Sequence, residues 1–333
     1  MNFRFFRKPK DERDDFPLPN IFISRPLKAQ TRVLKNENVW RRHSLLVTFS
    51  HTIRKNRSYF SHLPKIAIQF SEKRTPPPNH FPIYCEHGWL PRDHYQISSK
   101  GVNQRHHVTL ELAEGPKEYS EIQQSEDQAR LTILRALFGE FKTPTRLCEK
   151  PFFVFSLQMT NDLNLHRSGL EVASMAGRKG IENEFKESIS RMMATAAPGV
   201  RMIFLQHPSE SITRAPLLCP GHEYIPNSLK IRTLDLAISP ACQGVITINS
   251  NAMNEALLFS KPVFQLGDFL TRAFPNLHFP YTLEQFLRNP TECSMLARTD
   301  SYLGTLLRSQ RTLQEMTDPT VVRELIETEL SRC

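Results

Sequence analysis

The stretch GVITINSNAMNEALLFSKPVFQLG, residues 244–267, decides the fold class. It begins with an apolar, β-branched run at 244–249, which predicts a buried strand. An amphipathic segment at 250–260 predicts a helix, and KPVFQLG at 261–267 predicts a second strand. A strand, a helix and a strand of these lengths form a right-handed parallel βαβ unit. We therefore predict an α/β protein built on parallel sheets.

The same alternation extends along the chain on both sides of this stretch. PFFVFSLQ at 151–158 and VRMIFLQ at 200–206 are almost wholly apolar, as in strands that are covered on both faces. Between them, 183–197 predicts an amphipathic helix, and 229–239 predicts a shorter one. The segment from residue 281 onward is predicted to be helical.

The N-terminal half is predicted to contain strands and one long helix. Three short apolar runs predict the strands: 44–51, 65–70 and 81–86. The helix is predicted over 125–141, with Ser125 and Gln128 forming a capping box at its start. KTPTRLCEKP at 142–151 has the proline and charge content of a linker.

These patterns divide the chain into four parts. The predicted parts are a basic arm at 1–45, a short N-terminal lobe at 46–150, a second lobe at 151–290 and C-terminal helices at 291–333. A chain of 333 residues is long enough for two domains, and 39% of its residues are hydrophobic. The fold class that we predict is therefore α/β with two Rossmann-like lobes.

Composition favours a cytoplasmic protein. The longest apolar runs fall well short of the roughly 20 residues that span a bilayer, and the basic N-terminal segment lacks the apolar stretch of a signal peptide. The six cysteines are widely and irregularly spaced without a C-x-x-C pair, which favours free thiols over a zinc site or a disulfide framework.

The net charge of +9 leaves several partners open. Much of the excess lies before residue 60, where it fits a solvated tail as well as contact with an anionic membrane face or an anionic substrate. No zinc finger, helix-turn-helix or RNA-recognition signature accompanies it, so a nucleic-acid partner is not predicted.

Four polar stretches follow predicted strands. They are EHGWLPRD at 86–93, QMTNDLN at 158–164, HPSES at 207–211 and SNAMNEA at 250–256. In open α/β sheets, ligands bind at the carboxyl ends of the strands. The four stretches are therefore predicted to contain the functional site.

Individual residues in these stretches have both functional and structural readings. Ser250 or Asn251 could bind an anion at a helix start, or could simply cap that helix. Glu255 could meet a ribose hydroxyl, or could be a favourable first-turn acid. The turn of His207 and Pro208 aims an imidazole, although a lone histidine is more often structural.

The same stretches resemble a known family, the bacterial capsule polysaccharide biosynthesis proteins that transfer Kdo to the lipid-linked linker of group 2 capsules. The residues that match its strand–helix–strand motif are Ser250, Glu255, Ala256, Leu257, Lys261, Pro262 and Val263. The family's His-Pro pair matches His207 and Pro208, and its strand ending in Gln with a following Asp matches Gln158 and Asp162. The residues that match its acidic-x-Gly loop and the segment after it are Glu86, Gly88, Leu90, Pro91, Gly101, Val102 and Asn103.

This chain departs from the family pattern at several positions. Asn251 stands where the family has Thr, Asn254 occupies an apolar position, and the helix glycine is absent. His87 stands where related CMP-sugar enzymes often carry a second acid. Ser209 and Glu210 follow His-Pro, where a basic residue is usual.

The resemblance implies a GT-B glycosyltransferase that takes a Kdo-like sugar from a CMP-sugar donor and transfers it to a lipid-linked or saccharide acceptor. It implies an acceptor- and sugar-side lobe at 46–150 and a nucleotide-binding lobe at 151–290. The residues that it implies for binding CMP are Gln158, His207, Pro208, Ser250, Asn251 and Glu255. Those implied for catalysis are Glu86, with His87 and Asp162 in reserve. Such a donor is anionic, and dipoles and an imidazole suit it without a metal ion or a further cofactor.

Two other functions remain open from the sequence. The chain could transfer another CMP-activated nonulosonate, such as a sialic-acid-like sugar. It could also be a non-catalytic partner in capsule assembly or export that keeps the sugar-nucleotide fold. Contact with the inner membrane surface is expected from the basic lead and the lipid-linked acceptor.

Overall fold

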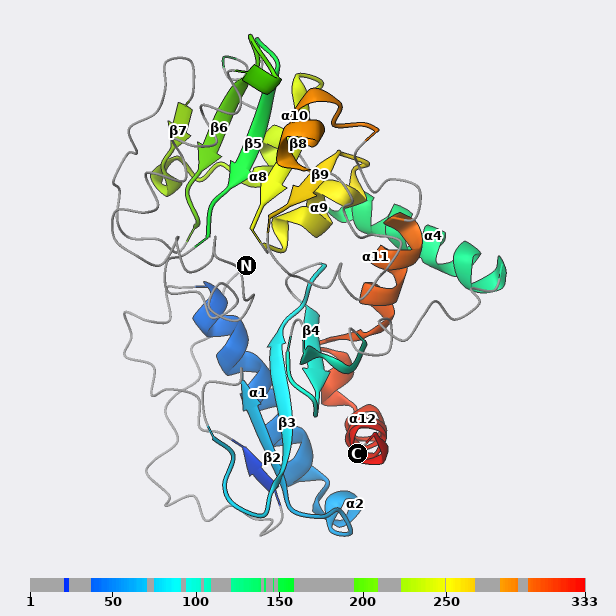
Figure 1. Ribbon diagram of the computed structural model, residues 1–333. Coiled ribbons are helices and arrows are strands. Elements are labelled where there is room, and N and C mark those ends of the chain that lie inside the picture. Colours follow the sequence, from blue (N-terminus) through cyan, green and yellow to red (C-terminus); the bar gives the residue numbers. More distant parts are fainter. Residues whose placement is uncertain are drawn as a thin grey trace, which may run out of the picture. The chain divides into compact units, whose positions relative to one another are not determined.

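The protein is described here by a computed structural model (Figure 1). The residues that it describes are 21–23, 37–70, 75–90, 94–102, 105–108, 121–138, 141, 146, 149–158, 195–208, 223–248, 250–266, 282–292 and 299–332. The chain divides into two compact units. Unit 1 comprises Met1–His87, Ile97–Val102 and Thr312–Cys333, and unit 2 comprises Gly88–Gln96 and Asn103–Arg311. The C-terminal residues from 312 onward therefore cluster with the N-terminal ones.

Unit 2 contains a five-stranded parallel sheet. Its strands are β5 (Phe152–Ser156), β6 (Arg201–Leu205), β7 (Glu223–Ile225), β8 (Cys242–Thr247) and β9 (Val263–Gln265). They pair in the order β7-β6-β5-β8-β9, and every pair is parallel. This is the doubly wound order, in which the direction of winding reverses between the first strand and the fourth, here β5 and β8. The strands predicted at 151–158, 200–206, 244–249 and 261–267 are confirmed.

Both faces of this sheet are covered. Side chains alternate along each strand, so Phe152 and Val154 of β5 join one apolar core while Phe153 and Phe155 join the other. Helices α8 (Thr233–Ala237) and α9 (Ala252–Leu258) contribute to the first core, and α10 (Leu283–Arg288) contributes to the second. Burial on both faces explains why these strands read as continuous apolar runs.

The second sheet has the strand order β1-β2-β3-β4-β10. Its strands are β1 (Ile21–Ile23), β2 (Ile66–Phe70), β3 (Phe81–His87), β4 (His94–Ser98) and β10 (Gln310–Thr312). The first three strands belong to unit 1 and run parallel. The strand predicted at 65–70 is confirmed, and the one predicted at 81–86 extends one residue further. The α/β class with two lobes built on parallel strands is therefore confirmed.

The strand predicted at 44–51 is wrong, because these residues lie inside helix α1 (Glu37–Lys55). From residue 44 onward, the buried side chains of this helix are Leu45, Leu46, Phe49, Thr52 and Ile53, which recur at helical spacing. Val47, in the middle of the apolar run, is 45% exposed. A short apolar run does not distinguish a strand from one face of a helix. Together with β1, this helix gives regular structure to parts of the segment for which the sequence predicts an arm.

The remaining helices of unit 1 pack near the C-terminus of the chain. They are α2 (Arg57–Phe60), η8 (Glu315–Thr317) and α12 (Pro319–Ser331). Thr52 of α1 donates a hydrogen bond from its hydroxyl to the carbonyl of Met316, at 3.0 Å. Met316 itself is fully buried. The C-terminal segment therefore completes the core of unit 1.

Helix α4 (Glu121–Leu137) begins four residues before the predicted start. Ser125 and Gln128 lie inside it, so the predicted capping box is wrong. The buried side of α4 contains Asp127, which forms an ion pair with Arg308 of helix α11 (Thr299–Arg308). Gly304 of α11 faces this aspartate so closely that a Cβ atom there would lie 2.1 Å from Asp127 Oδ2. The two helices can therefore pack this closely only with glycine at that position.

Other predictions concern membrane spans, cysteines and segments that lie outside the described residues. Among the described residues, no helix combines the length and apolar character needed to cross a bilayer.

The structure also describes two of the six cysteines. Among the described residues, Cys85 and Cys242 are buried and form no disulfide. Burial, followed by the charges of Glu86 and Glu329, raises the pKa of the Cys85 thiol far above its ordinary value. Most of the helix predicted at 183–197 lies outside the described residues.

Candidate functional site

Three of the residues predicted to bind a nucleotide lie at one edge of the sheet in unit 2. Gln158, His207 and Ser250 follow strands β5, β6 and β8, which are adjacent in the sheet. Because these strands are parallel, their carboxyl ends share one edge. The winding reverses between β5 and β8, and this reversal is where ligands bind in open α/β sheets. The structure thus brings these three residues to the edge that the sequence predicts.

The turn after β6 is fixed by a neighbouring segment. The backbone N–H of Asn227 donates to Gln206 Oε1 at 3.0 Å. The side chain of Asn227 donates to the carbonyls of His207 at 3.5 Å and Pro208 at 3.4 Å. These bonds hold the backbone that carries the half-buried imidazole of His207. The sequence analysis missed Asn227, which lies in a short 3₁₀ turn after β7 and has no motif of its own.

The start of α9 uses Ser250 and Asn251 in different ways. Ser250 Oγ accepts a hydrogen bond from the backbone N–H of Ala252 at 3.3 Å. Asn251 occupies the N-cap position in a helical conformation, and its side chain makes no capping bond. Instead, Asn251 Nδ2 donates to the carbonyl of Gly88 at 3.3 Å. Asn251, which stands where the family has Thr, therefore forms a hydrogen bond to the backbone at Gly88. The sequence pattern does not predict this contact.

Two charged residues, Glu255 in α9 and Arg232 before α8, interact electrostatically. Glu255 is half-buried in the first turn of the helix. Arg232 donates to the buried carboxylate of Asp235, with Nη2 2.7 Å from Oδ1. The pKa of Arg232 is raised, first by this hydrogen bond and further by the charges of Asp235 and Glu255. A guanidinium thus lies near enough to interact with Glu255, and the sequence analysis missed it.

Hydroxyl groups also gather at the carboxyl ends of β5 and β8. Ser156 and Thr247 are register partners, so their side chains project from the same face of the sheet. Ser156 Oγ is 3.0 Å from Thr233 Oγ1 at the start of α8. Thr247 Oγ1 is buried and has no hydrogen-bond partner within the part of the chain that the structure describes. The carboxyl ends of these two strands therefore carry hydroxyl groups directly after apolar residues.

Asn254 explains one departure from the family pattern. It is fully buried in α9, and its Oδ1 accepts a hydrogen bond from the hydroxyl of Tyr302 at 2.8 Å. Burial raises the pKa of Tyr302 far above its ordinary value, so this hydroxyl stays protonated and can donate. A polar residue replaces an apolar one here because α11 supplies its partner. Asn254 therefore fixes α9 in place, which is a structural role.

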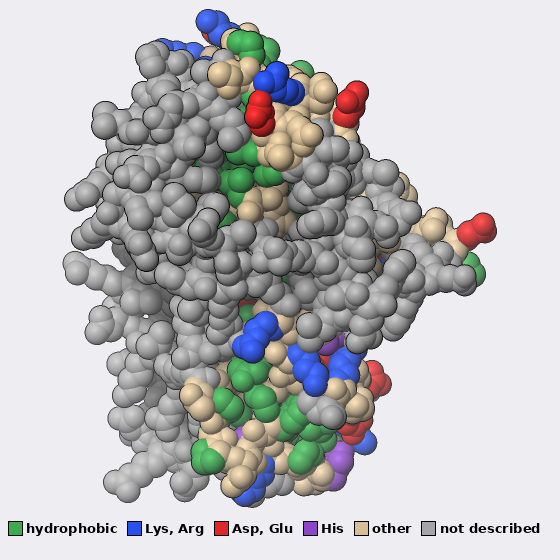
Figure 2. Space-filling view, viewed as in Figure 1, with side chains coloured by type: hydrophobic (Ala, Val, Ile, Leu, Met, Phe, Trp, Pro, Cys, Tyr) green, Lys and Arg blue, Asp and Glu red, His purple; other side chains and the backbone are tan. Residues whose placement is uncertain are grey.

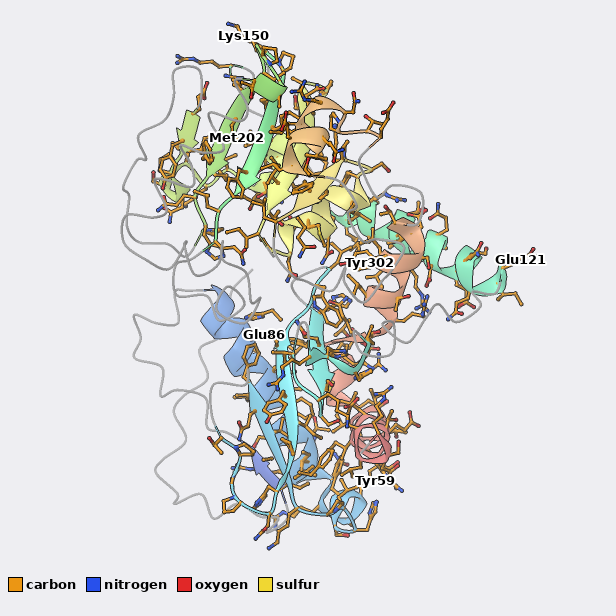
Figure 3. All side chains as sticks on the ribbon, in the orientation of Figure 1. Tyr59, Glu86, Glu121, Lys150, Met202 and Tyr302 are labelled. Atoms are coloured by element: carbon orange, nitrogen blue, oxygen red, sulfur yellow. The ribbon has the colours of Figure 1, made fainter. Side chains whose placement is uncertain are left out.

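Glu86 and His87 are the last two residues of strand β3, so His87 belongs to the strand and not to the loop predicted after it. Residues alternate between the two faces of a strand, so the two side chains point to opposite faces. His87 is 9% exposed, and its ring packs edge-on against Phe70, with ring centroids 5.1 Å apart. Glu86 is half-buried, and its Oε1 accepts a hydrogen bond from the backbone N–H of His87 at 3.1 Å (Figure 3). The two residues therefore cannot act on the same side of β3.

The turn after β3 is packed tightly. Trp89 and Leu90 are fully buried, and the ring of Trp89 lies edge-on to His106, with centroids 4.8 Å apart. The backbone N–H of Gly88 donates to the carbonyl of His94 at 2.6 Å. A Cβ atom on Gly88 would lie 2.4 Å from Gln310 Oε1 and 2.9 Å from the His94 carbonyl. Only glycine fits, which gives a steric reason for the acidic-x-Gly pattern at this position.

The segment after β4 is held by the C-terminal helix of unit 1. Glu329 of α12 is fully buried, and its Oε2 accepts from the backbone N–H of Ser99 at 2.6 Å and from its hydroxyl at 2.9 Å. Arg332 pairs with the other carboxylate oxygen. Gly101 has a φ of 137°, which side chains disfavour. Glu329 was also missed by the sequence analysis.

Several predicted residues lie outside the described part of the chain. They are Pro91, Asn103, Asp162, Ser209 and Glu210. The expected reserve role of Asp162 is therefore untested.

Comparison with known proteins gives a structural similarity only. No family model matches the chain, and no curated protein matches it. One similar solved structure is that of KpsC from Thermosulfurimonas dismutans, a beta Kdo 2,4 transferase, with 14% identity and a TM-score of 0.46 over 60% of this chain and 68% of that one. The corresponding beta Kdo 2,7 transferase has 12% identity and a TM-score of 0.46, over 84% of this chain and 89% of that one.

A third similar structure is the glycosyltransferase SnogD from Streptomyces nogalater. It has 10% identity and a TM-score of 0.35, over 91% of this chain and 84% of that one. These identities and TM-scores are too low to carry a statement about the activity of this chain.

Proposed function

We propose that the protein is a GT-B glycosyltransferase that transfers a Kdo-like keto-sugar acid from a CMP-sugar to a lipid-linked or saccharide acceptor. The observation that carries this proposal is the position of Gln158, His207 and Ser250 around the reversal point of the doubly wound sheet. Motif residues that are distant in sequence meet where such sheets bind nucleotides. The resemblance of these motifs to the Kdo-transferring family supplies the donor class.

Binding of the donor is assigned to the sheet edge in unit 2. A CMP-sugar of this kind carries a phosphodiester and a sugar carboxylate, so its site requires hydrogen-bond donors and positive charge. His207 would donate to the phosphate, and Ser250 would add a hydroxyl. Glu255 would accept from a ribose hydroxyl, and Arg232, held beside it by Asp235, would balance its charge.

Transfer is assigned to the end of β3. A hydroxyl of the acceptor attacks the anomeric carbon of the donor sugar, and the bond from that carbon to the phosphate oxygen breaks. The proton of the hydroxyl passes to Glu86 as general base, and CMP leaves with the bonding electrons. The transition state resembles an oxocarbenium ion, which a nearby carboxylate also stabilises.

A CMP-release assay tests this proposal with different activated sugars. We expect release with a CMP-Kdo donor in the presence of a saccharide acceptor, and no loss of rate on addition of EDTA. Faster release with a CMP-sialic-acid donor would favour the alternative nonulosonate transferase. Binding of CMP without release from any donor would favour the non-catalytic capsule assembly or export partner.

We also propose that the basic N-terminal part contacts an anionic membrane surface, where a lipid-linked acceptor would be found. Each Lys or Arg near such a surface contributes about 1 kcal/mol, screened by salt. Most of residues 1–36 lie outside the described residues. In the view of Figure 2, the Lys and Arg side chains of the described part occur in several separate places among apolar and neutral ones.

A further inference from the structure

Gln310 of β10 makes three hydrogen bonds to two consecutive residues of the turn after β3. Its Oε1 accepts from the backbone N–H of Trp89 at 2.5 Å and from that of Leu90 at 3.1 Å. Its Nε2 donates to the carbonyl of Leu90 at 2.7 Å. Gln310 is 3% exposed, so water cannot readily replace it in these bonds.

Two further bonds complete the fastening of this turn. The N–H of Gly88 donates to the carbonyl of His94, and the carbonyl of Gly88 accepts from the side chain of Asn251. Together with the three bonds of Gln310, five backbone groups of residues 88–90 are satisfied. Asn251 belongs to the segment that we assign to nucleotide binding, so that segment is hydrogen-bonded to this turn.

A buried glutamine that forms hydrogen bonds to the backbone of a turn could contribute only to the stability of the fold. The position of the turn argues for more, because it begins one residue after His87 and two residues after Glu86. The turn is covalently continuous with the last residues of β3, so its position restrains them, and a shift of about 1 Å in a reacting group can lower a rate by about 10²-fold. Gln310 forms hydrogen bonds to both residues after Gly88. Its Oε1 also lies so close to Gly88 that a side chain there would clash with it.

We propose that Gln310 is a positioning residue for the proposed transfer reaction: it holds the Gly88–Leu90 turn and thereby fixes the end of β3 that carries Glu86. This inference rests on the proposed function. It concerns the placement of the general base and not the binding of the nucleotide. It therefore predicts a loss of kcat without a loss of CMP affinity.

The test compares Gln310→Met with Gln310→Glu. Methionine keeps the volume and apolar contacts of the side chain but removes all three hydrogen bonds. Glutamate keeps an acceptor oxygen for both N–H groups, but it replaces the amide donor by a second oxygen that faces the carbonyl of Leu90. The matched control is Gln314→Met, the same substitution at an exposed glutamine four residues away.

For Gln310→Met we expect kcat to fall at least tenfold while the Kd for CMP stays within twofold of the wild-type value. Hydrogen exchange at the amides of Trp89 and Leu90 should be at least tenfold faster. Gln310→Glu should recover part of the loss in kcat, and Gln314→Met should resemble the wild type in every measurement. If Gln310→Met does not fold, Gln310→Glu is compared with the wild type and should show a smaller loss of the same kind.

Two results would overturn the proposal. One is faster amide exchange at residues 89–90 in Gln310→Met with kcat within twofold of wild type, which would leave Gln310 a structural role only. The other is unchanged exchange, which would show that Gln310 does not hold the turn. A wild-type protein that releases no CMP from any CMP-sugar would instead refute the proposed function. The exchange measurement would still show whether Gln310 holds the Gly88–Leu90 turn in place.

Discussion

Glu86→Gln is expected to lower kcat by about 10²-fold or more while leaving the Kd for CMP nearly unchanged. Glutamine keeps the size of the side chain and can still accept a hydrogen bond from the N–H of His87. It removes the charge and the basicity, so it cannot take the proton of the acceptor hydroxyl. Single-turnover kinetics with a CMP-sugar and an acceptor would measure the chemical step, and CMP titration would measure binding.

The matched control for this prediction is His87→Ala. Because Glu86 and His87 point to opposite faces of β3, only one of them can face the reacting sugar. His87 packs against Phe70, so we expect its loss to lower stability more than turnover. Normal turnover in Glu86→Gln with an inactive but folded His87→Ala would move the base to the other face of the strand. Normal turnover in both would remove the end of β3 from the chemistry and leave Asp162 as the carboxylate to test.

His207→Ala should weaken CMP binding by about 10- to 150-fold. A charge-assisted hydrogen bond to phosphate contributes roughly 1.5–3 kcal/mol, which converts to that range of Kd. The backbone of the turn is held by Asn227 through the carbonyls of His207 and Pro208, so the substitution should leave the turn in place. Calorimetric titration with CMP would measure the change.

His62→Ala is a suitable control for the loss of an imidazole. The side chain of His62 is 49% exposed and pairs with Glu327 in unit 1. The Kd for CMP should be the same in this variant as in the wild type. An unchanged Kd in His207→Ala would mean that the imidazole does not contact the nucleotide, and that the His-Pro pair shapes the turn only.

The sheet of unit 2 was predictable because each of its longer strands is a nearly continuous apolar run in the sequence. Runs such as 151–158 and 200–206 are apolar at nearly every position and rich in Phe, Val and Ile, a pattern that favours strands buried on both faces of a parallel sheet. The parallel direction of the strands was predicted from the βαβ connections, whereas their order is known only from the structure. The end of each strand, and hence the edge that holds Gln158, His207 and Ser250, was predictable for the same reason.

Helix α1 was not predictable from the same kind of run. The apolar residues between 44 and 51 are few enough to fit a strand, and the helical spacing becomes visible only when Thr52 and Ile53 are counted as buried. Local pattern does not reveal that a polar threonine will be buried. Thr52 is buried because Met316, 264 residues away, accepts its hydrogen bond.

The residues that hold the candidate site were missed for a related reason. Gln310, Glu329 and Asn227 have no motif around them, and each acts on a segment that is distant in sequence or in another element. Gln310 meets Leu90 across 220 residues, and Glu329 meets Ser99 across 230. A single glutamine or glutamate in a C-terminal segment gives no sign of such a partner. Motif reasoning finds the groups that do chemistry more readily than the groups that hold them.

The most direct test of the donor assignment is a comparison of nucleotides by thermal shift on the full-length protein. CMP at a hundredfold excess over its Kd should stabilise the folded protein by about 2.7 kcal/mol, whereas UMP and AMP at the same concentration should give little or no stabilisation. His207→Ala should lose most of the CMP effect, which ties the signal to the sheet edge. Stabilisation by UMP or AMP without stabilisation by CMP would contradict the proposal that the protein uses a CMP-activated sugar.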